Sequence, residues 1–311
     1  MENQLLNVTA HLSTIVLGKE KEIKLALACL LSKGHLLIED LPGMGKTTLA
    51  HALANALGLS YQRTQFTSDL LPADIIGVSI FDEKSHSFKL HQGPLFNQVV
   101  LADEINRASP KTQSALLEAM EDRQISIDNQ TYPLPTPFFV IATQNPLFHS
   151  GTYPLPESQL DRFTMRLSLG FPSVEAERQI LSASNIGNNF NNDKNLEGVI
   201  NAEQLLAMQN EVQQVNCEAN VIDYVIALCN VTRQPDFNGN PLSPRAGKAL
   251  IACAKAWAYL HQRDFVLPDD IQTVFIAVCE HRLDAGYTDA VHGKLALQVI
   301  AQVDVLNPLN Q

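Results

Sequence analysis

Residues 39–48 read EDLPGMGKTT, and this stretch decides how the rest of the chain is interpreted. It agrees with the second half of the phosphate-loop pattern G-x-x-x-x-G-K-[ST], because Gly45, Lys46 and Thr47 occupy the last three required positions. Asp40 stands where the pattern places its first glycine. That glycine helps the chain to leave a strand but supplies no phosphate ligand, so the substitution can be tolerated. The alternative is an ordinary turn that happens to contain these letters.

The flanking sequence favours a working loop. HLLIE at 35–39 is a short apolar run typical of a buried strand. TTLAHALANALG at 47–58 carries leucines at helical spacing and ends on a glycine. A strand, a glycine turn and a helix therefore follow one another directly, as a phosphate loop requires.

Such a loop would bind nucleotide phosphates at the positive end of a helix, through backbone N–H groups. Lys46 would reach the β- and γ-phosphates, and the Thr47 hydroxyl would suit Mg²⁺, which prefers oxygen ligands. We predict that the nucleotide-binding residues of the loop are Gly43, Met44, Gly45, Lys46, Thr47 and Thr48.

The alternation of strands and helices continues after the loop. Apolar runs at 98–103 and 138–143 each precede a helical pattern, at 110–122 and 156–163, and 164–169 is one more strand-like run. Alternation of this kind predicts an α/β fold with a parallel sheet covered by helices.

Two segments interrupt the alternation, and a third changes its character. Residues 77–93 and 123–134 each consist of two strand-like halves around a polar turn, which predicts a hairpin in each. After residue 171 the sequence reads as helices only. We therefore predict a nucleotide-binding domain at 1–171 and an all-helical domain at 172–311.

Polar residues end two of the predicted strands. Asp103 and Glu104 follow an apolar run, and Asn145 follows another. At the carboxyl edge of a parallel sheet these residues would face the phosphate loop. Asp103, with Thr47, would then hold Mg²⁺, Glu104 would polarise the attacking water, and Asn145 would orient it. Considered alone, the Asp103–Glu104 pair would be interpreted as the solvated end of a strand. Asn145 alone would be interpreted as part of an ordinary Asn-Pro turn.

Composition bounds the remaining possibilities. The chain has 311 residues, of which 45% are hydrophobic, and a formal charge of −11 from 22 basic and 33 acidic residues. This acidic balance argues against non-specific binding of nucleic acid. The five cysteines form no C-x-x-C pair, which favours reduced, buried thiols. We find neither a signal-peptide pattern nor an apolar run of membrane-spanning length, and we expect a cytoplasmic protein.

Taken together, the segments resemble the MoxR family of AAA+ ATPases. The resemblance is carried by EDLPGMGKT, LADEINRASPKTQSALLEAMED, IATQNP, GTYPLPESQLDRF and SPRAGKAL, in this order. It extends over essentially the whole chain, and the family also has Asp at the position of Asp40. The resemblance implies an AAA+ P-loop core, with a parallel five-stranded sheet between helices, and a helical lid. It also implies that the two hairpins are the helix-2 and pre-sensor-1 insertions.

Two arginines gain roles from this resemblance. Arg162 in LDRF matches an arginine finger, which reaches the ATP of a neighbouring subunit and neutralises transition-state charge. Arg245 in SPRA matches sensor 2, a lid arginine that senses the γ-phosphate. Without the family, Arg162 would be interpreted as a surface arginine paired with Asp161 or Glu157. Arg245 would be a helix-start residue after a Ser243 cap and a proline.

The resulting expectation is an Mg²⁺-dependent ATPase that assembles into a ring, most simply a hexamer. The resemblance implies a chaperone-like role in maturing protein complexes, a client protein, and a partner with a von Willebrand A domain. Three alternatives stay open: a motor acting on nucleic acid, a nucleotide switch without turnover, and the AAA+ subunit of a metal chelatase. The acidic charge argues against nucleic acid as a partner of this chain.

Overall fold

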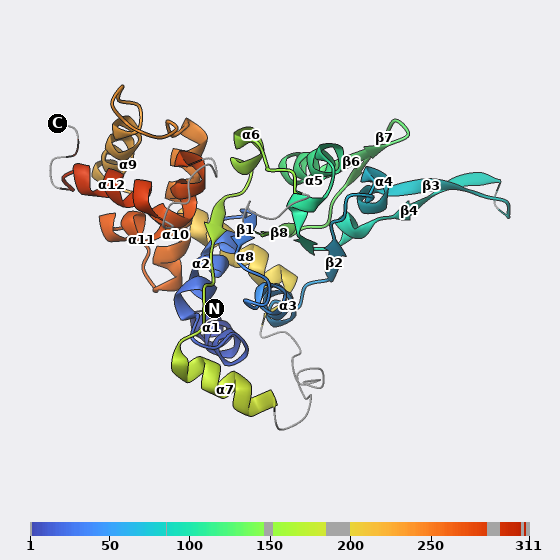
Figure 1. Ribbon diagram of the computed structural model, residues 1–311, viewed down its shortest axis with the longest axis horizontal. Coiled ribbons are helices and arrows are strands. Elements are labelled where there is room, and N and C mark those ends of the chain that lie inside the picture. Colours follow the sequence, from blue (N-terminus) through green and yellow to red (C-terminus); the bar gives the residue numbers. More distant parts are fainter. Residues whose placement is uncertain are drawn as a thin grey trace.

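A five-stranded parallel sheet lies at the centre of the molecule, in the order β2–β5–β8–β1–β9 (Figure 1). The computed structural model describes residues 2–84, 86–145, 152–184, 200–284, 293–305 and 308. The strands are β1 (Leu36–Glu39), β2 (Tyr61–Gln65), β5 (Val99–Asp103), β8 (Phe139–Gln144) and β9 (Met165–Leu167). The predicted α/β fold with a parallel five-stranded sheet is confirmed.

Helices cover both faces of the sheet, because successive side chains of each strand point to opposite sides. Leu36 and Ile38 pack into one apolar cluster with helices α1, α2 and α3, whereas Leu37 packs into a second cluster with α4 and α5. The bounds of these helices are Glu2–Ile15, Glu20–Leu31, Lys46–Ala56, Pro72–Ile76 and Pro110–Asp122. Both faces of β1, β5 and β8 are therefore buried, as their continuous apolar sequences predict.

The C-terminal part of the chain is helical. It contains α7 (Val174–Ser184), α8 (Ala202–Gln214), α9 (Ala219–Val231), α10 (Pro244–Leu260), α11 (Pro268–Leu283) and α12 (Lys294–Gln302). Helix α10 packs on α2, and the apolar cluster that covers the first face of the sheet continues through α8–α12 without a break. The helices after α7 thus share one core with the α/β part, and the division at 171/172 stays a prediction.

Two antiparallel ladders project from the α/β part. Strands β3 (Gly77–Asp82) and β4 (Ser87–Gln92) form a long ribbon that extends away from the rest of the chain (Figure 1). Strands β6 (Gln124–Ile127) and β7 (Gln130–Pro133) form a shorter one. Asp128 and Asn129 in its turn both have positive φ, the conformation that two-residue hairpin turns need.

One strand differs from the sequence-based prediction, and one segment of interest lies outside the residues that the structure describes. Strand β2 was missed, because its residues YQRTQ are largely exposed at the sheet edge and show no apolar run. The Asn-rich segment 187–195 lies outside the described residues. All five cysteines are free thiols, and burial raises the pKa of Cys253 to about 12. Within the part of the chain that is described, no helix has the length and apolarity of a membrane span.

Candidate nucleotide-binding site

The carboxyl ends of β1, β5 and β8 bring the predicted phosphate loop and the predicted catalytic residues together. These three strands are neighbours and run parallel, with Glu39 opposite Gln144. The loop after β1, the acidic pair that ends β5 and Asn145 after β8 therefore meet at one edge of the sheet.

The phosphate loop turns sharply into helix α3. Gly45 has φ 85° and lies at the N-cap of the helix, a left-handed conformation that a side chain would strain. Helix α3 then begins at Lys46, so its first N–H groups are free of intrahelical partners and available to an anion. Met44 and Thr47 are half-buried beside the turn and Thr48 is exposed.

Lys46 lies at the centre of the edge and is only 7% exposed. Its Nζ donates to the Asp40 carbonyl oxygen at 2.6 Å and to Asn145 Oδ1 at 3.1 Å. Burial lowers the pKa of Lys46, while the nearby carboxylates, Asp40, Asp103 and Glu104 foremost, counteract this by favouring the ammonium form. The ammonium is thus held by exchangeable oxygen partners at the place where phosphates would arrive.

Asp103 and Glu104 are fixed by partners on both neighbouring strands. Asp103 Oδ1 accepts from Thr143 Oγ1 at 2.6 Å, and its Oδ2 accepts from the Arg63 guanidinium at 2.6 Å. Glu104 has φ 56° and ψ 50°, an uncommon conformation for a residue other than glycine, and its N–H donates to Thr143 Oγ1 at 2.9 Å. Strained backbone of this kind is concentrated at functional sites.

The Glu104 carboxylate has a polar partner on each oxygen. Asn145 Nδ2 donates to Oε1 at 3.1 Å, which links Glu104 through the amide of Asn145 to Lys46. Gln65 Nε2 and Arg107 Nη1 donate to Oε2 at 2.8 and 2.7 Å. Arg107 thus contacts Glu104 of its own chain.

Arg63 and Gln65 are site residues that sequence reasoning missed. Both lie on β2, whose register places Gln65 opposite Asp103. Because both residues are polar, the sequence of β2 lacks the apolar run by which the other strands of the sheet were predicted. The available signal was a polar, alternating segment placed directly after α3, where an edge strand of the sheet would be expected.

Arg162 and Arg245 both bind the carboxylate of Glu121, and neither contacts the groups around Lys46. Glu121 accepts from both, at 3.1 Å from Arg162 and 3.3 Å from Arg245, and Arg245 also lies 3.9 Å from the Asp161 carboxylate. The predicted cap of α10 is confirmed, since Ser243 Oγ accepts from the Ala246 N–H at 3.2 Å and a proline follows Ser243.

This arginine pair lies at the opposite edge of the sheet from the phosphate loop. Arg162 precedes β9, and the N–H of Thr164 donates to the carbonyl of His35, which lies before the first residue of β1. Lys46 follows the last residue of β1, about 13 Å further along a four-residue strand. Glu121 lies near the C-terminal end of α5, whereas Asp103 and Glu104 precede its N-terminal end. The 13-residue helix separates the two ends by roughly 18 Å.

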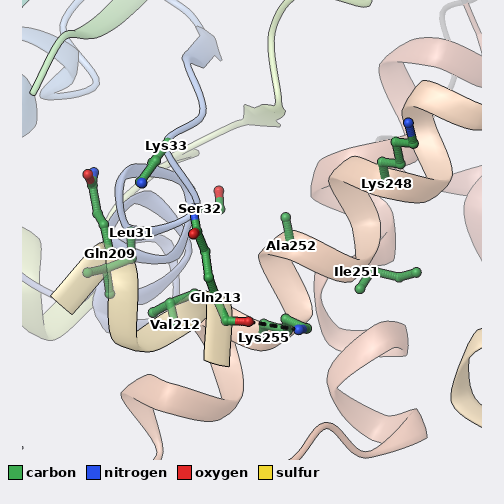
Figure 2. Close-up of a pocket in the computed structure, with 10 residues that line it drawn as sticks. All are labelled: Leu31, Ser32, Lys33, Gln209, Val212, Gln213, Lys248, Ile251, Ala252 and Lys255. Atoms are coloured by element: carbon green, nitrogen blue, oxygen red, sulfur yellow. Dashed lines mark hydrogen bonds between the residues drawn. The ribbon is translucent and has the colours of Figure 1, made fainter. Parts of the chain in front are cut away.

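A cavity of about 270 Å³ lies elsewhere, where α2 meets α8 and α10. Figure 2 shows Lys33, Lys248 and Lys255 around it, with Lys255 Nζ donating to the Gln213 carbonyl at 3.1 Å. The lining residues come from the junction of the α/β part with the C-terminal helices, so this cavity is separate from the phosphate loop.

Comparison with known proteins agrees with this geometry. The profile of the "ATPase family associated with various cellular activities (AAA)" matches residues 35–165, and that of the "AAA lid domain" matches residues 240–300. A crystal structure of a candidate ATPase from Cytophaga hutchinsonii superposes with a TM-score of 0.86 at 34% identity, covering 99% of this chain and 95% of that one.

Curated relatives extend over most of the chain. "Uncharacterized protein YeaC" of Bacillus subtilis is 46% identical, covering 88% of this chain and 84% of its own. "Chaperone MoxR1" of Mycobacterium tuberculosis is 38% identical, and the match covers 92% of this chain and 77% of that protein. The phosphate loop, the acidic pair, the sheet order and these similarities lead to one conclusion. The chain belongs to the MoxR family of AAA+ ATPases.

Proposed function

We propose that this ATPase hydrolyses ATP with Mg²⁺ at sites shared between neighbouring copies in a ring, most simply a hexamer. The observation that carries the proposal is the separation of two groups of residues. Lys46, Glu104 and Asn145 lie at the carboxyl edge of the sheet, whereas Arg162 and Arg245 lie at its amino edge. One chain thus presents two complementary halves of a site.

The phosphate-binding half comprises Gly43 to Thr48, with Asp103 beside them. Thr47 and Asp103 offer the hard oxygen ligands that Mg²⁺ prefers. A carboxylate has about four acceptor positions, and those of Asp103 are only partly used by Thr143 and Arg63, so it can also accept from a water on the ion. Thr47 and Asp103 would hold the ion, which would offset the negative charge of the phosphates.

Glu104 and Asn145 supply the chemistry at the γ-phosphate. Glu104 would accept the proton of the attacking water, and Asn145, which contacts both Glu104 and Lys46, would orient that water without adding charge. Lys46 would exchange its present oxygen partners for phosphate oxygens. Positioning and charge compensation of this kind account for most of the catalysis of phosphoryl transfer.

Arg162 and Arg245 would act together on the ATP of the next copy. In the single chain both are held by Glu121, and their side chains are 29% and 48% exposed, so neither is locked inside the fold. An arginine supplied from a neighbour neutralises charge in the transition state and is worth about 10³–10⁵ in rate. Arg245 would thereby sense a neighbour's γ-phosphate rather than that of its own chain.

The β3–β4 ribbon is the surface that we assign to a client protein. Phe81 and Phe88 are 49% and 74% exposed, and their ring centroids lie 5.4 Å apart. Exposed apolar side chains gathered in this way mark interaction surfaces. With the MoxR relatives, this supports a chaperone-like role in maturing protein complexes. The proposal of a von Willebrand A domain protein as a further partner rests on the family resemblance alone.

The direct test is steady-state ATP hydrolysis over a range of protein concentrations, with Mg²⁺ or with a chelator of divalent ions. We expect the activity per chain to rise with concentration and to vanish without Mg²⁺. An activity that is independent of concentration would contradict a shared site. A salt-sensitive increase on adding DNA would favour the nucleic-acid motor instead, and nucleotide binding without turnover would favour the switch.

A further inference from the structure

We propose that Asp40 is a positioning residue that couples the phosphate loop to the connection between β9 and α7. The inference concerns the residue that departs from the phosphate-loop pattern. It rests on the proposed nucleotide site, and the experiment below separates failure of that site from failure of the coupling.

The Asp40 carboxylate is a fixed acceptor for the chain that follows β9. It is 8% exposed, and its Oδ2 accepts from the N–H groups of Leu169 and Gly170 at 2.6 and 2.7 Å and from Ser168 Oγ at 3.2 Å. Its Oδ1 accepts from the N–H of Leu41, the next residue, at 3.0 Å. Hydrogen bonds to a buried carboxylate are stronger than bonds between neutral groups. A glycine at this position would make none of them.

The main chain of Asp40 is bound to the group that nucleotide would displace. Lys46 Nζ donates to the Asp40 carbonyl at 2.6 Å. A phosphate-loop lysine contacts the β- and γ-phosphates when nucleotide is bound. Its ammonium would then leave or weaken the contact with Asp40. The arrival of nucleotide therefore changes the environment of the same residue whose side chain holds Leu169 and Gly170.

The held segment leads directly into helix α7. Gly170 has φ 61°, and the next carbonyl, of Phe171, accepts from Lys19 Nζ at 2.8 Å. Helix α7 is exposed over much of its length, with Val174 67% and Leu181 62% exposed although Ala176 is buried, and Figure 1 shows it apart from the other C-terminal helices. The contacts of residues 168–170 with Asp40 thus set where α7 leaves the α/β part.

The competing interpretation is that Asp40 is a tolerated departure with no role of its own. The two interpretations make opposite predictions for Asp40→Gly, which restores the standard phosphate-loop pattern. A tolerated departure would bind and hydrolyse ATP as well or better after the change. A positioning residue would keep its nucleotide affinity and lose the coupling, so that kcat falls about tenfold, comparable to one charge-assisted hydrogen bond, while Kd changes little.

The test is amide hydrogen exchange, read on peptides covering 41–48 and 165–182, with and without Mg²⁺ and the slowly hydrolysed analogue ATPγS. In the wild type we expect ATPγS to slow exchange in the first peptide and to alter it in the second. In Asp40→Gly we expect the first effect alone, with the Leu169 and Gly170 amides exchanging about tenfold faster in both conditions.

Two further variants keep the test decisive if Asp40→Gly does not fold. Asp40→Asn retains one oxygen for Leu169 and Gly170 but turns an N–H toward Leu41, and should give intermediate exchange. Ser168→Ala, the matched control, removes only the weakest bond and should resemble the wild type. Wild-type exchange at Leu169 and Gly170 in the Asp40 variants would overturn the coupling, as would a second peptide that ignores ATPγS in the wild type. A wild type whose first peptide ignores ATPγS would overturn the nucleotide site itself.

Discussion

The two edges of the central sheet differ in how their charged groups are used. At the carboxyl edge each charged side chain has partners from a neighbouring strand or loop, as Asp103 has Thr143 and Arg63. At the amino edge Arg162 and Arg245 share the carboxylate of Glu121, and the other nearby carboxylate, of Asp161, is shared between Arg245 and Arg282. The first arrangement is what a pre-formed binding site requires. The second leaves an excess of positive charge, which suits contact with an anionic group on another molecule.

This difference explains why a single chain should be a poor catalyst. The parallel sheet fixes the direction of every strand, so residues after β1 and residues before β9 cannot meet within one copy. A head-to-tail ring would place the amino edge of one copy against the carboxyl edge of the next. The predictions that follow perturb the edges separately, from the largest expected effect to the smallest.

Glu104→Gln should produce the largest loss. The substitution keeps the shape of the side chain and removes its ability to accept a proton, so we expect kcat to fall about 10²–10⁴-fold, the usual effect of losing a general base. The affinity for ATP should stay close to that of the wild type, because Lys46 and the loop are unchanged. Parallel measurement of turnover and of equilibrium nucleotide binding checks this, and loss of binding together with turnover would contradict the role.

Acid should destabilise the amino edge through His35. This residue is buried, its Nδ1 accepts from the Val140 N–H at 3.0 Å, and its Nε2 lies 3.2 Å from the Met120 carbonyl. Burial lowers the pKa of His35 to about 4. The unfolded chain binds a proton at His35 near pH 6.5, and the folded chain does not. The contribution of neutral, buried His35 to the free energy of unfolding is therefore complete above pH 6.5. It is lost as the pH falls toward 4.

The expected loss between pH 7 and pH 5 is about 2 kcal/mol in the free energy of unfolding. Urea denaturation at both values measures it, with His35→Gln as the variant that cannot titrate. The variant should lose about 2 kcal/mol less than the wild type over this interval. An equal loss in both proteins would show that His35 does not set the acid sensitivity.

Much of the carboxyl edge could be predicted from sequence, and much of the amino edge could not. Lys46, Asp103, Glu104 and Asn145 lie in local patterns at strand ends, and parallel strands bring such ends together. The convergence of Arg162 and Arg245 on Glu121 joins residues distant in the sequence, so local periodicity cannot show it. Similarly, Asp40 could be recognised as a departure from a pattern, but its partners at 168–170 become visible only in three dimensions.

Arg245→Ala should have a moderate effect that sharpens the comparison. Removing one charged contact to a neighbour's phosphate should lower kcat about tenfold at saturating protein concentration. Nucleotide affinity of dilute, unassembled protein should not change, because the arginine does not contact the nucleotide of its own chain. A lower affinity under dilute conditions would place Arg245 at the site of its own chain and contradict the arrangement.

Phe88→Ser on the β3–β4 ribbon should have the smallest effect on catalysis. The side chain is 74% exposed and belongs to neither edge, so basal turnover should change less than about twofold. Binding of a permanently unfolded model protein should weaken, because an exposed apolar contact is lost. Fluorescence anisotropy with that labelled probe measures the second effect. Unchanged probe binding would remove the ribbon from the client surface.

The most direct test of the shared site is to mix two inactive proteins, Glu104→Gln and Arg162→Ala, and measure ATP hydrolysis. Each variant is damaged at a different edge, so random mixing in a ring should restore roughly a quarter of the interfaces. The matched control mixes Glu104→Gln with Lys46→Ala, which are damaged at the same edge and should recover nothing. Recovery in the first mixture alone is the result that we predict. No recovery in either mixture, with a wild type that hydrolyses ATP at a rate independent of concentration, would contradict a site built from two copies.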